Sequence, residues 1–232
     1  MSNQFKGLNQ KLDVLLCNAG LWIKQPVFSK QGYAQTFAVN HLSHMLLVDN
    51  LYPLLKASPD SRVVNVSSIA ARPAPGISKD PSIDLDDIMN QKASNFDGNQ
   101  DYGESKFANV LFTKALHIFN SEVTKAHMTT YALHPGVISS SLLRDFNCIQ
   151  KTLSLIAKPL LMTETEGAEN NIFCSIQDHR KLRSGDFYNS LKIEPVYSKA
   201  ESRDYQKAFW NKSIDLINQK VSQKMTHLTP FN

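Results

Sequence analysis

No two glycines in this chain are separated by a single residue, although the sequence contains nine glycines. The Gly-x-Gly turn with which many α/β folds hold a pyrophosphate is therefore absent. Gly98 and Gly103 have the outer spacing of a P-loop, but Glu104 follows where that motif requires lysine. Neither of the two common glycine-rich phosphate loops is present in these residues.

Metal-ligand spacing is also lacking. The three cysteines, Cys17, Cys148 and Cys174, are far apart and odd in number, so we expect reduced thiols in the core or in turns. His41 and His44 are three residues apart on a predicted helix, but no His-Glu-x-x-His motif accompanies them. The sequence therefore predicts no metal site.

Concentrated charge and long apolar runs are scarce. The net charge is +4, and the basic residues cluster only at 179–183, so we expect no nucleic-acid partner. The apolar run 153–162 contains Lys158 and Pro159 and is too short to span a bilayer. We interpret it as a flap over a substrate pocket or as core. No secretory signal is visible at the N-terminus, so a cytoplasmic protein is expected, with an anchor before Met1 left open.

What is present is the composition of a globular protein, with 42% hydrophobic and 20% charged residues. At 232 residues we expect one domain, residues 1–232. Apolar runs alternate with helical periodicity along the chain, which predicts an α/β fold with a doubly wound parallel sheet. The predicted strands are 12–17, 62–68 and 129–133. The predicted helices are 29–56, 102–119, 163–175 (opened by a capping box) and 199–221.

The pattern Tyr-x-x-x-Lys occurs three times, at Tyr52, Tyr102 and Tyr188. Only Tyr102 begins a long amphipathic run, which places Tyr102 and Lys106 on one helix face. A free phenol has a pKa of about 10, and a nearby cation lowers it, so Lys106 is expected to make Tyr102 a usable acid or base. Ser68, at the end of a predicted strand, can hold a substrate oxygen. The alternative is a helix-start tyrosine, a solvated lysine and an ordinary strand end.

Taken together, these segments resemble the short-chain dehydrogenase/reductase family. The segments that carry the resemblance are Cys17-Asn18-Ala19-Gly20, Val39-Asn40-His41, Val66-Ser67-Ser68, Tyr102 to Lys106, and His134-Pro135-Gly136-Val137. Cys17 replaces the first asparagine of the family's turn. The resemblance implies a Rossmann-like fold and an enzyme that interconverts an alcohol and a carbonyl with NADP or NAD, NADP being slightly favoured.

The resemblance also implies roles for individual residues. The implied catalytic residues are Ser68, Tyr102, Lys106 and Asn40, with Asn40 supporting a proton-relay water and the second serine of the pair acting on substrate. The implied cofactor-binding residues are Asn18, Ala19, Gly20, Tyr102, Lys106, Pro135, Gly136, Val137 and Ser140.

Four further segments restrict the resemblance to one branch of the family. They are Asp84 to Ile88, Glu104 to Thr113, Glu166 to Ala168 and Gly185 to Asn189. These segments resemble the retinol-dehydrogenase-like and WW-domain-oxidoreductase-like branch. That branch implies a small apolar carbonyl or alcohol as substrate, of the retinoid, steroid or aldehyde class. The sequence leaves the oligomeric state open, a homo-oligomer included.

The opening residues, 1–10, resemble the end of the helix that precedes the family's fourth strand. We therefore expect a Rossmann-like domain that is incomplete at its N-terminus and lacks the glycine-rich units. On this expectation the 232-residue chain binds neither NAD nor NADP at micromolar concentration. The alternative function is a non-catalytic remnant or binding module that no longer holds a dinucleotide.

Overall fold

The computed structural model describes residues 10–71, 83, 96–136, 164–222 and 224–231. Within them the strands form one sheet in the order β1-β2-β3-β4-β5. The first four strands are parallel, and β5 runs antiparallel to β4. The strands are β1 (Val14–Cys17), β2 (Arg62–Val66), β3 (Thr129–Leu133), β4 (Phe187–Asn189) and β5 (Lys192–Ile193). This mostly parallel sheet confirms the predicted α/β class.

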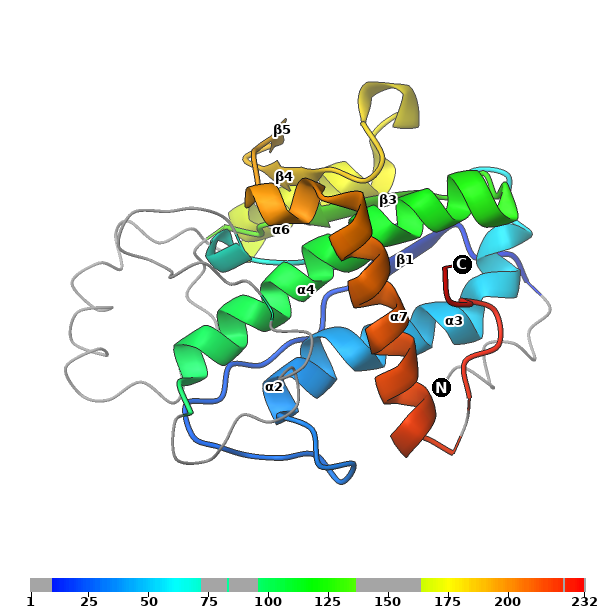
Figure 1. Cartoon of the computed structure of the whole chain (residues 1–232). Helices are drawn as coiled ribbons and strands as arrows, with labels where there is room; N and C mark the ends of the chain where they lie inside the picture. The colour runs from blue at the N-terminus through cyan, green and yellow to red at the C-terminus, as the bar shows by residue number, and fades with distance from the viewer. Residues whose placement is uncertain (1–9, 72–82, 84–95, 137–163, 223, 232) are drawn as a thin grey trace.

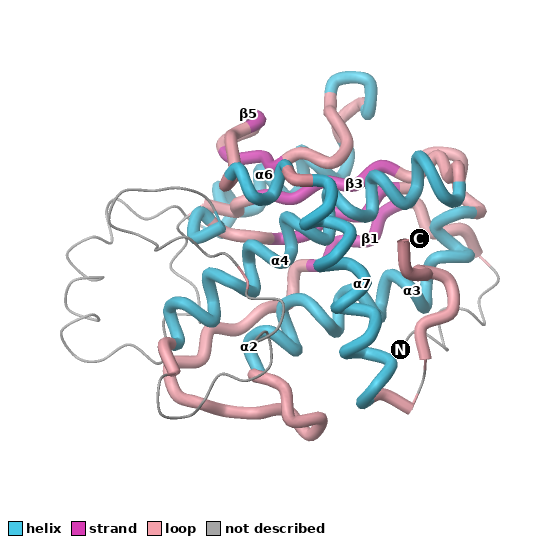
Figure 2. Tube along the Cα trace, in the orientation of Figure 1, coloured by secondary structure: helices cyan, strands magenta, loops and turns pink. Residues whose placement is uncertain are grey.

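Helices cover both faces of the sheet, as Figure 1 shows. The long helix α4 crosses one face, with α7 packed on it and α3 beside it, while α6 lies on the opposite face. Figure 2 separates these helices from the strands and the loops. The helices are α2 (Gln35–Phe37), α3 (Ser43–Lys56), α4 (Gly98–Ile118), α6 (Glu164–Ile176) and α7 (Arg203–Lys220). Two π-helical turns, η1 (Ala38–Leu42) and η4 (Phe119–Thr124), join α2 to α3 and extend α4, and short 3-10 turns occupy Ile69–Ala71, His179–Lys181 and Ser198–Glu201.

The side chains of β2 point alternately to the two faces of the sheet and so contribute to two separate hydrophobic clusters. Val63 belongs to the large cluster formed with α3, α4 and α7, whereas Val64 and Val66 belong to a smaller cluster with α6. Side chains of a strand point alternately to opposite faces, so a central strand packs against the helices on both faces. All residues of β2 are buried accordingly. Among the described residues, no helix has both the length and the apolar character that crossing a membrane requires.

Two predicted helix starts were wrong. The helix predicted from Ser29 begins at Gln35, because Gly32 adopts φ 79° and a bridge joins Phe28 to Ala34. The helix predicted from Tyr102 begins at Gly98. There the Asp97 side chain accepts hydrogen bonds from the backbone N–H groups of the first turn, as an N-cap residue does.

Smaller differences concern the other elements. The strand predicted at 12–17 begins at Val14, and the strand predicted at 62–68 ends at Val66, which leaves Ser67 and Ser68 in the turn that follows. The terminal helix spans 203–220, preceded by a 3-10 turn. The predicted flap at 153–162, and Thr163 of the predicted capping box, lie outside the described residues.

The C-terminal segment is fixed to α3 by one buried carboxylate. Asp49 accepts hydrogen bonds from the backbone N–H groups of Thr226, His227 and Leu228, the shortest at 2.7 Å. Three convergent donors suit an anionic acceptor, because hydrogen bonds to charged groups are stronger than neutral ones.

Asp49→Asn is expected to lower the free energy of unfolding by about 1–2 kcal/mol, because it removes the charge and turns an N–H toward the backbone donors. Urea unfolding of the variant measures the loss. Asp215→Asn, at an exposed position on α7, is the matched control and should change stability little. Equal stability of the two variants would contradict the role given to Asp49.

Candidate active site

Three side chains predicted from the sequence meet at the carboxyl end of β2. Ser68 lies just beyond the strand, and Tyr102 and Lys106 come from the first half of α4. The Ser68 hydroxyl interacts with the Tyr102 phenol. The Lys106 ammonium donates to the Val66 carbonyl at 2.9 Å and lies 5.7 Å from the centroid of the Tyr102 ring. The structure thus brings together a hydroxyl, a phenol and a cation.

The two serines of this turn have different surroundings. Ser67 is buried, and its hydroxyl donates to the backbone carbonyl of Lys106 at 2.6 Å, which ties the strand end to α4. Ser68 instead accepts a bond from the Ala70 backbone N–H at 3.2 Å and faces Tyr102. Only the second serine can therefore present its hydroxyl to a molecule bound beside the phenol.

The pKa of Tyr102 differs from the sequence-based expectation. Burial raises the pKa of the phenol above its ordinary value, and the hydrogen bond with Ser68 offsets this only in part. The same burial lowers the pKa of Lys106 to about 8. The expectation that Lys106 lowers the pKa of Tyr102 was therefore wrong for this structure: loss of water outweighs the attraction of an ammonium whose nearest partner is a carbonyl.

Asn40 fixes the turn that follows β1. It lies in the π-helical turn η1, a local widening that often occurs at functional sites. Its side chain accepts from the Leu21 backbone N–H at 2.8 Å and donates to the Leu21 carbonyl at 2.9 Å and to Ser105 Oγ at 3.0 Å. Both N–H groups of the amide are thus engaged, which makes Asn40 a residue that positions the turn.

A side chain in place of Gly20 in that turn would crowd two neighbouring side chains. A Cβ on Gly20 would lie 3.2 Å from Lys106 Nζ and 3.3 Å from Asn40 Oδ1. Asn18, Ala19 and Gly20 are exposed, so the turn presents its backbone to solvent beside the ammonium. The structure brings this predicted group next to Lys106.

The remaining predicted residues follow β3. Pro135 and Gly136 stand at the carboxyl end of that strand, and Gly136 adopts φ 92°, a conformation that favours glycine. The Ser67 N–H donates to the Leu133 carbonyl at 2.7 Å, which holds the ends of β2 and β3 together. A cavity of about 160 Å³ here is lined by Pro135, Gly136, Glu166, Glu169, Asn170, Asn189, Ser190 and Leu191. Val137 and Ser140 lie outside the described residues.

Three further residues of this region were not predicted from the sequence. The Trp22 ring stacks on that of Tyr102. Asp101 is buried, and burial raises the pKa of its carboxyl to about 6, an effect that the nearby Thr36 hydroxyl partly offsets. Gly98 lies against the backbone of residues 23 and 24. The available signals were an aromatic residue two positions after the Asn-Ala-Gly turn and an acidic residue just before Tyr102.

The paired histidines of the predicted helix are core residues. His41 is buried among aromatic rings, and its Nε2 lies 3.1 Å from Ser213 Oγ. Burial lowers the pKa of His41 to about 3 and that of His44 to about 4. Across the described part of the chain, no cluster of three metal-ligating side chains occurs. Cys17 and Cys174 are free and buried, and burial raises the pKa of each thiol to about 12; Cys148 lies outside the described residues.

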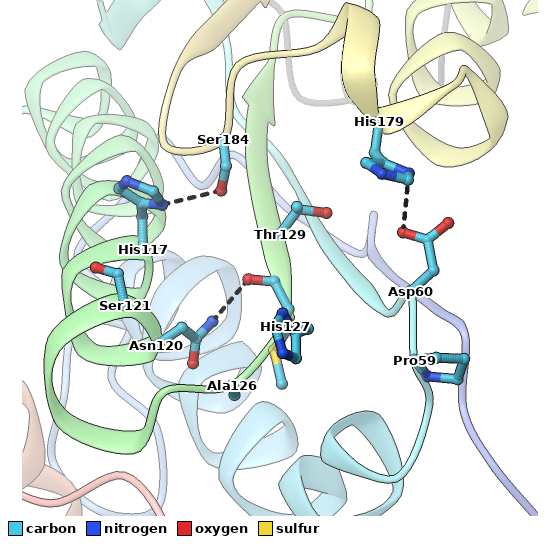
Figure 3. A pocket seen from close by; sticks show the side chains of 11 residues that line it. Pro59, Asp60, His117, Asn120, Ser121, Ala126, His127, Thr129, His179 and Ser184 are labelled. Atoms are coloured by element: carbon cyan, nitrogen blue, oxygen red, sulfur yellow. Dashed lines mark hydrogen bonds and ion pairs between the residues drawn. The ribbon is translucent and has the colours of Figure 1, made fainter.

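A second cavity, of about 280 Å³, lies at the other end of the sheet, where the parallel strands begin (Figure 3). Its walls come from the amino ends of β2 and β3, the end of α4 and the loop before β4. His179 pairs with Asp60 at 3.4 Å, and His117 lies 3.1 Å from Ser184 Oγ. Because parallel strands share one direction, this end is remote from Ser68 and Lys106, which follow the carboxyl end of β2.

Comparisons with known proteins concern the sequence family and the fold. The sequence profile of the short chain dehydrogenase family matches residues 1–78. The chain is 32% identical to human retinol dehydrogenase 12 over 213 residues, which are 92% of this chain and 63% of that protein. The chain thus spans less than two thirds of the length of that relative.

Solved structures show the same fold. An uncharacterised protein from Mycobacterium paratuberculosis matches with a TM-score of 0.69 and 24% identity, over 97% of this chain and 72% of that one. The NADPH-bound carbonyl reductase from chicken fatty liver matches with a TM-score of 0.54 and 17% identity, over 83% of this chain and 69% of that one. At these identities the likeness concerns the arrangement of strands and helices.

Proposed function

We propose that the chain belongs to the short-chain dehydrogenase/reductase family, on its retinol-dehydrogenase-like side, and serves an oxidoreductase that interconverts an apolar alcohol and carbonyl with NADPH or NADH. The observation that carries the proposal is the meeting of Ser68, Tyr102 and Lys106 at the carboxyl end of β2. Ligands of open α/β sheets bind at that edge. Substrates of the retinoid, steroid or aldehyde class are proposed from the relatives.

The residues present fit the nicotinamide half of the cofactor. Gly20 leaves open the space beside Lys106 Nζ that a Cβ would fill. The Lys106 ammonium has three N–H groups, and Val66 takes one of them; none of the described residues is found to engage the other two. We propose that Lys106 and the Asn18–Gly20 turn hold the ribose of the cofactor, which supplies the hydride when bound.

The chain's own residues then handle the proton. The Ser68 hydroxyl donates to the substrate carbonyl oxygen and holds it beside the phenol. Tyr102, whose raised pKa keeps the phenol protonated near neutrality, gives its proton to the same oxygen as negative charge develops there. A protonated phenol can act as the acid that carbonyl reduction requires.

The test is an assay of NADPH consumption with retinal or an aliphatic aldehyde, coupled to detection of the alcohol. It is run on the 232-residue chain and on a chimera that carries a glycine-rich strand–turn–helix before Met1. We expect turnover in the chimera at least. A folded chimera that binds NADPH without forming alcohol would overturn the proposal and favour the non-catalytic alternative.

The serine pair provides a sharper comparison. Ser68→Ala is expected to lower kcat by about 10²-fold, because the donor to the substrate oxygen is lost. Ser67→Ala removes a bond to the Lys106 carbonyl and is expected to lower stability by about 1–2 kcal/mol with a smaller effect on kcat. Steady-state kinetics and thermal unfolding of both variants separate the effects. Equal losses of kcat, or the reverse ranking, would contradict the assignment of Ser68.

The lowered pKa of Lys106 predicts how the rate of carbonyl reduction depends on pH. Its pKa is lowered from 10.5 to about 8, so the cation is lost as the pH rises through about 8, while Tyr102 keeps its proton. We expect kcat/KM for reduction, which reports the free enzyme, to fall above that pH. Lys106→Arg stays charged throughout and should remove this decline from whatever activity remains. The same midpoint in both proteins would show that another group titrates.

A further inference from the structure

An aromatic ring outside the proposed catalytic set covers the proposed acid. The rings of Trp22 and Tyr102 are stacked, with centroids 4.7 Å apart and planes inclined by 19°. Trp22 lies in the loop after β1, and its indole N–H donates to the Gly98 carbonyl at 3.0 Å. This bond fixes the indole against the first turn of α4, one helical turn before Tyr102. Trp22 is therefore attached to α4 at two points: the hydrogen bond to Gly98 and the ring contact with Tyr102.

A second cation lies on the far side of the indole. Lys24 Nζ is 3.3 Å from the centroid of the Trp22 ring. Since a nitrogen has no room between two rings 4.7 Å apart, Lys24 occupies the face of the indole that Tyr102 does not. The Lys24 ammonium also donates to Asn99 Oδ1 at the start of α4. Cation–π attraction thus presses the indole from outside, toward Tyr102.

The part of the loop that carries these residues is held at Leu21, Trp22 and Lys24. Asn40 bonds both backbone groups of Leu21, Trp22 bonds Gly98, and Lys24 bonds Asn99. Gly98 allows this approach, because a Cβ there would lie 2.5 Å from the Ile23 carbonyl oxygen. A loop built only to fill space would not need so many specific polar contacts next to one helix turn.

We propose that Trp22 is a positioning residue for Tyr102, whose ring it holds in one plane and shields from water on one face, with Lys24 pressing it into place. The inference rests on the proposed function and extends it to the control of the proposed acid. It assigns to Trp22 no contact with substrate. Its effect on the reaction passes through the orientation and hydration of the phenol.

Kinetics test the consequence for turnover. Trp22→Ala should lower kcat about 2- to 10-fold with KM unchanged, which is the range of an aromatic pair expressed as a rate. Trp22→Phe keeps a ring and should restore most of that loss. Water admitted by the alanine variant should lower the pH at which the phenol ionises, since burial is what raises its pKa. The other charged or polar groups around Tyr102 are Ser68, Lys106, Asp101 and, beyond the indole, Lys24.

Fluorescence tests the contact itself without turnover. The chain has two tryptophans, and the ring partners of Trp210 are Phe112, Phe119 and Phe231. Ionisation of Tyr102 at high pH should therefore quench Trp22 alone. Trp210→Phe should keep this alkaline transition, whereas Trp22→Phe and Tyr102→Phe should each lose it.

The kinetic and the fluorescence results together distinguish failure of the role proposed for Trp22 from failure of the proposed function. If Tyr102→Phe abolishes turnover, but Trp22→Ala changes neither kcat nor its pH midpoint, and Trp22→Phe keeps the alkaline quench, the role of Trp22 is overturned and the proposed function stands. If the quench follows Tyr102 and Trp22 while no variant and no wild-type protein turns over, the contact is supported and the proposed function fails. Should Trp22→Ala unfold, Trp22→Phe with the fluorescence titration still decides.

Discussion

Replacing Tyr102 by phenylalanine is expected to lower kcat for reduction by about 10²–10⁴-fold, the range of general acid–base catalysis. Phenylalanine keeps the ring, and with it the stacking on Trp22, but removes the hydroxyl that faces Ser68. The fold should therefore survive while the proton donor is lost. The measurement is steady-state kinetics on the chimera that binds NADPH, with circular dichroism to confirm an intact fold.

Tyr52→Phe is the matched control, because Tyr52 also begins a Tyr-x-x-x-Lys pattern. Its hydroxyl is bonded to Asn120 Oδ1 at 2.8 Å and lies 2.8 Å from Thr124 Oγ1, so its loss should cost stability and leave kcat near the wild-type value. Wild-type turnover in Tyr102→Phe would sink the assignment of Tyr102 as the acid. A comparable loss of kcat in both variants would show that the effect is a general one on folding.

Gly98→Ala should be among the most damaging substitutions of a single methyl group in this chain. The added Cβ would lie 2.5 Å from the Ile23 carbonyl oxygen and 2.7 Å from Lys24 Cα, and both of these are backbone atoms that no side-chain rotation can move. We expect a loss of about 3 kcal/mol in the free energy of unfolding, as for severe overpacking. The loop that carries Trp22 must move away from α4, so kcat should fall as well.

Gly103→Ala, on the same helix, separates this clash from any general effect of the substitution. The nearest atom to its Cβ would be the Ala70 carbonyl oxygen at 3.8 Å, an ordinary contact. Removing a glycine from a helix interior should then stabilise it by up to about 1 kcal/mol. Chemical denaturation of the two variants decides. Similar stability of both would mean that the loop at residues 23 and 24 yields easily.

The sequence was sufficient for strands β1, β2 and β3 and insufficient for β4, β5 and the loops that approach the sheet. Short runs rich in apolar and β-branched residues mark β2 and β3 as buried parallel strands, and both were found within two residues of their predicted ends. The start of α4 was missed because the predicted helix was anchored on its apolar periodicity, whereas the first turn is polar. Its cap, Asp97, is one acidic residue in a polar stretch, and only the folded backbone shows which N–H groups it meets.

The proposed site, too, has features that the sequence predicts and features that only the structure shows. The convergence of Ser68, Tyr102 and Lys106 could be predicted, because their spacing along strand and helix fixes their direction, while their roles remain proposals. The raised pKa of Tyr102 could not, because it depends on how much water the surrounding loops exclude. Trp22 lies in a loop with no periodicity, so no pattern relates it to a tyrosine far along the chain. The role proposed for Trp22 could be inferred only from the position of its loop against Gly98.

The parallel pairing of β2 with β3 has a consequence for how the protein acquires its site. Arg62 lies opposite Thr129, and the connection between the two strands contains the whole of α4. Such a pairing closes a long loop before any contact compensates for the lost chain entropy, and contacts of this kind form slowly. Ser68 and Lys106 are both synthesised before β3, yet the strand end that fixes them is bonded to Leu133. Recovery of turnover during refolding should therefore follow closure of the β2–β3 pair and lag behind the appearance of helix.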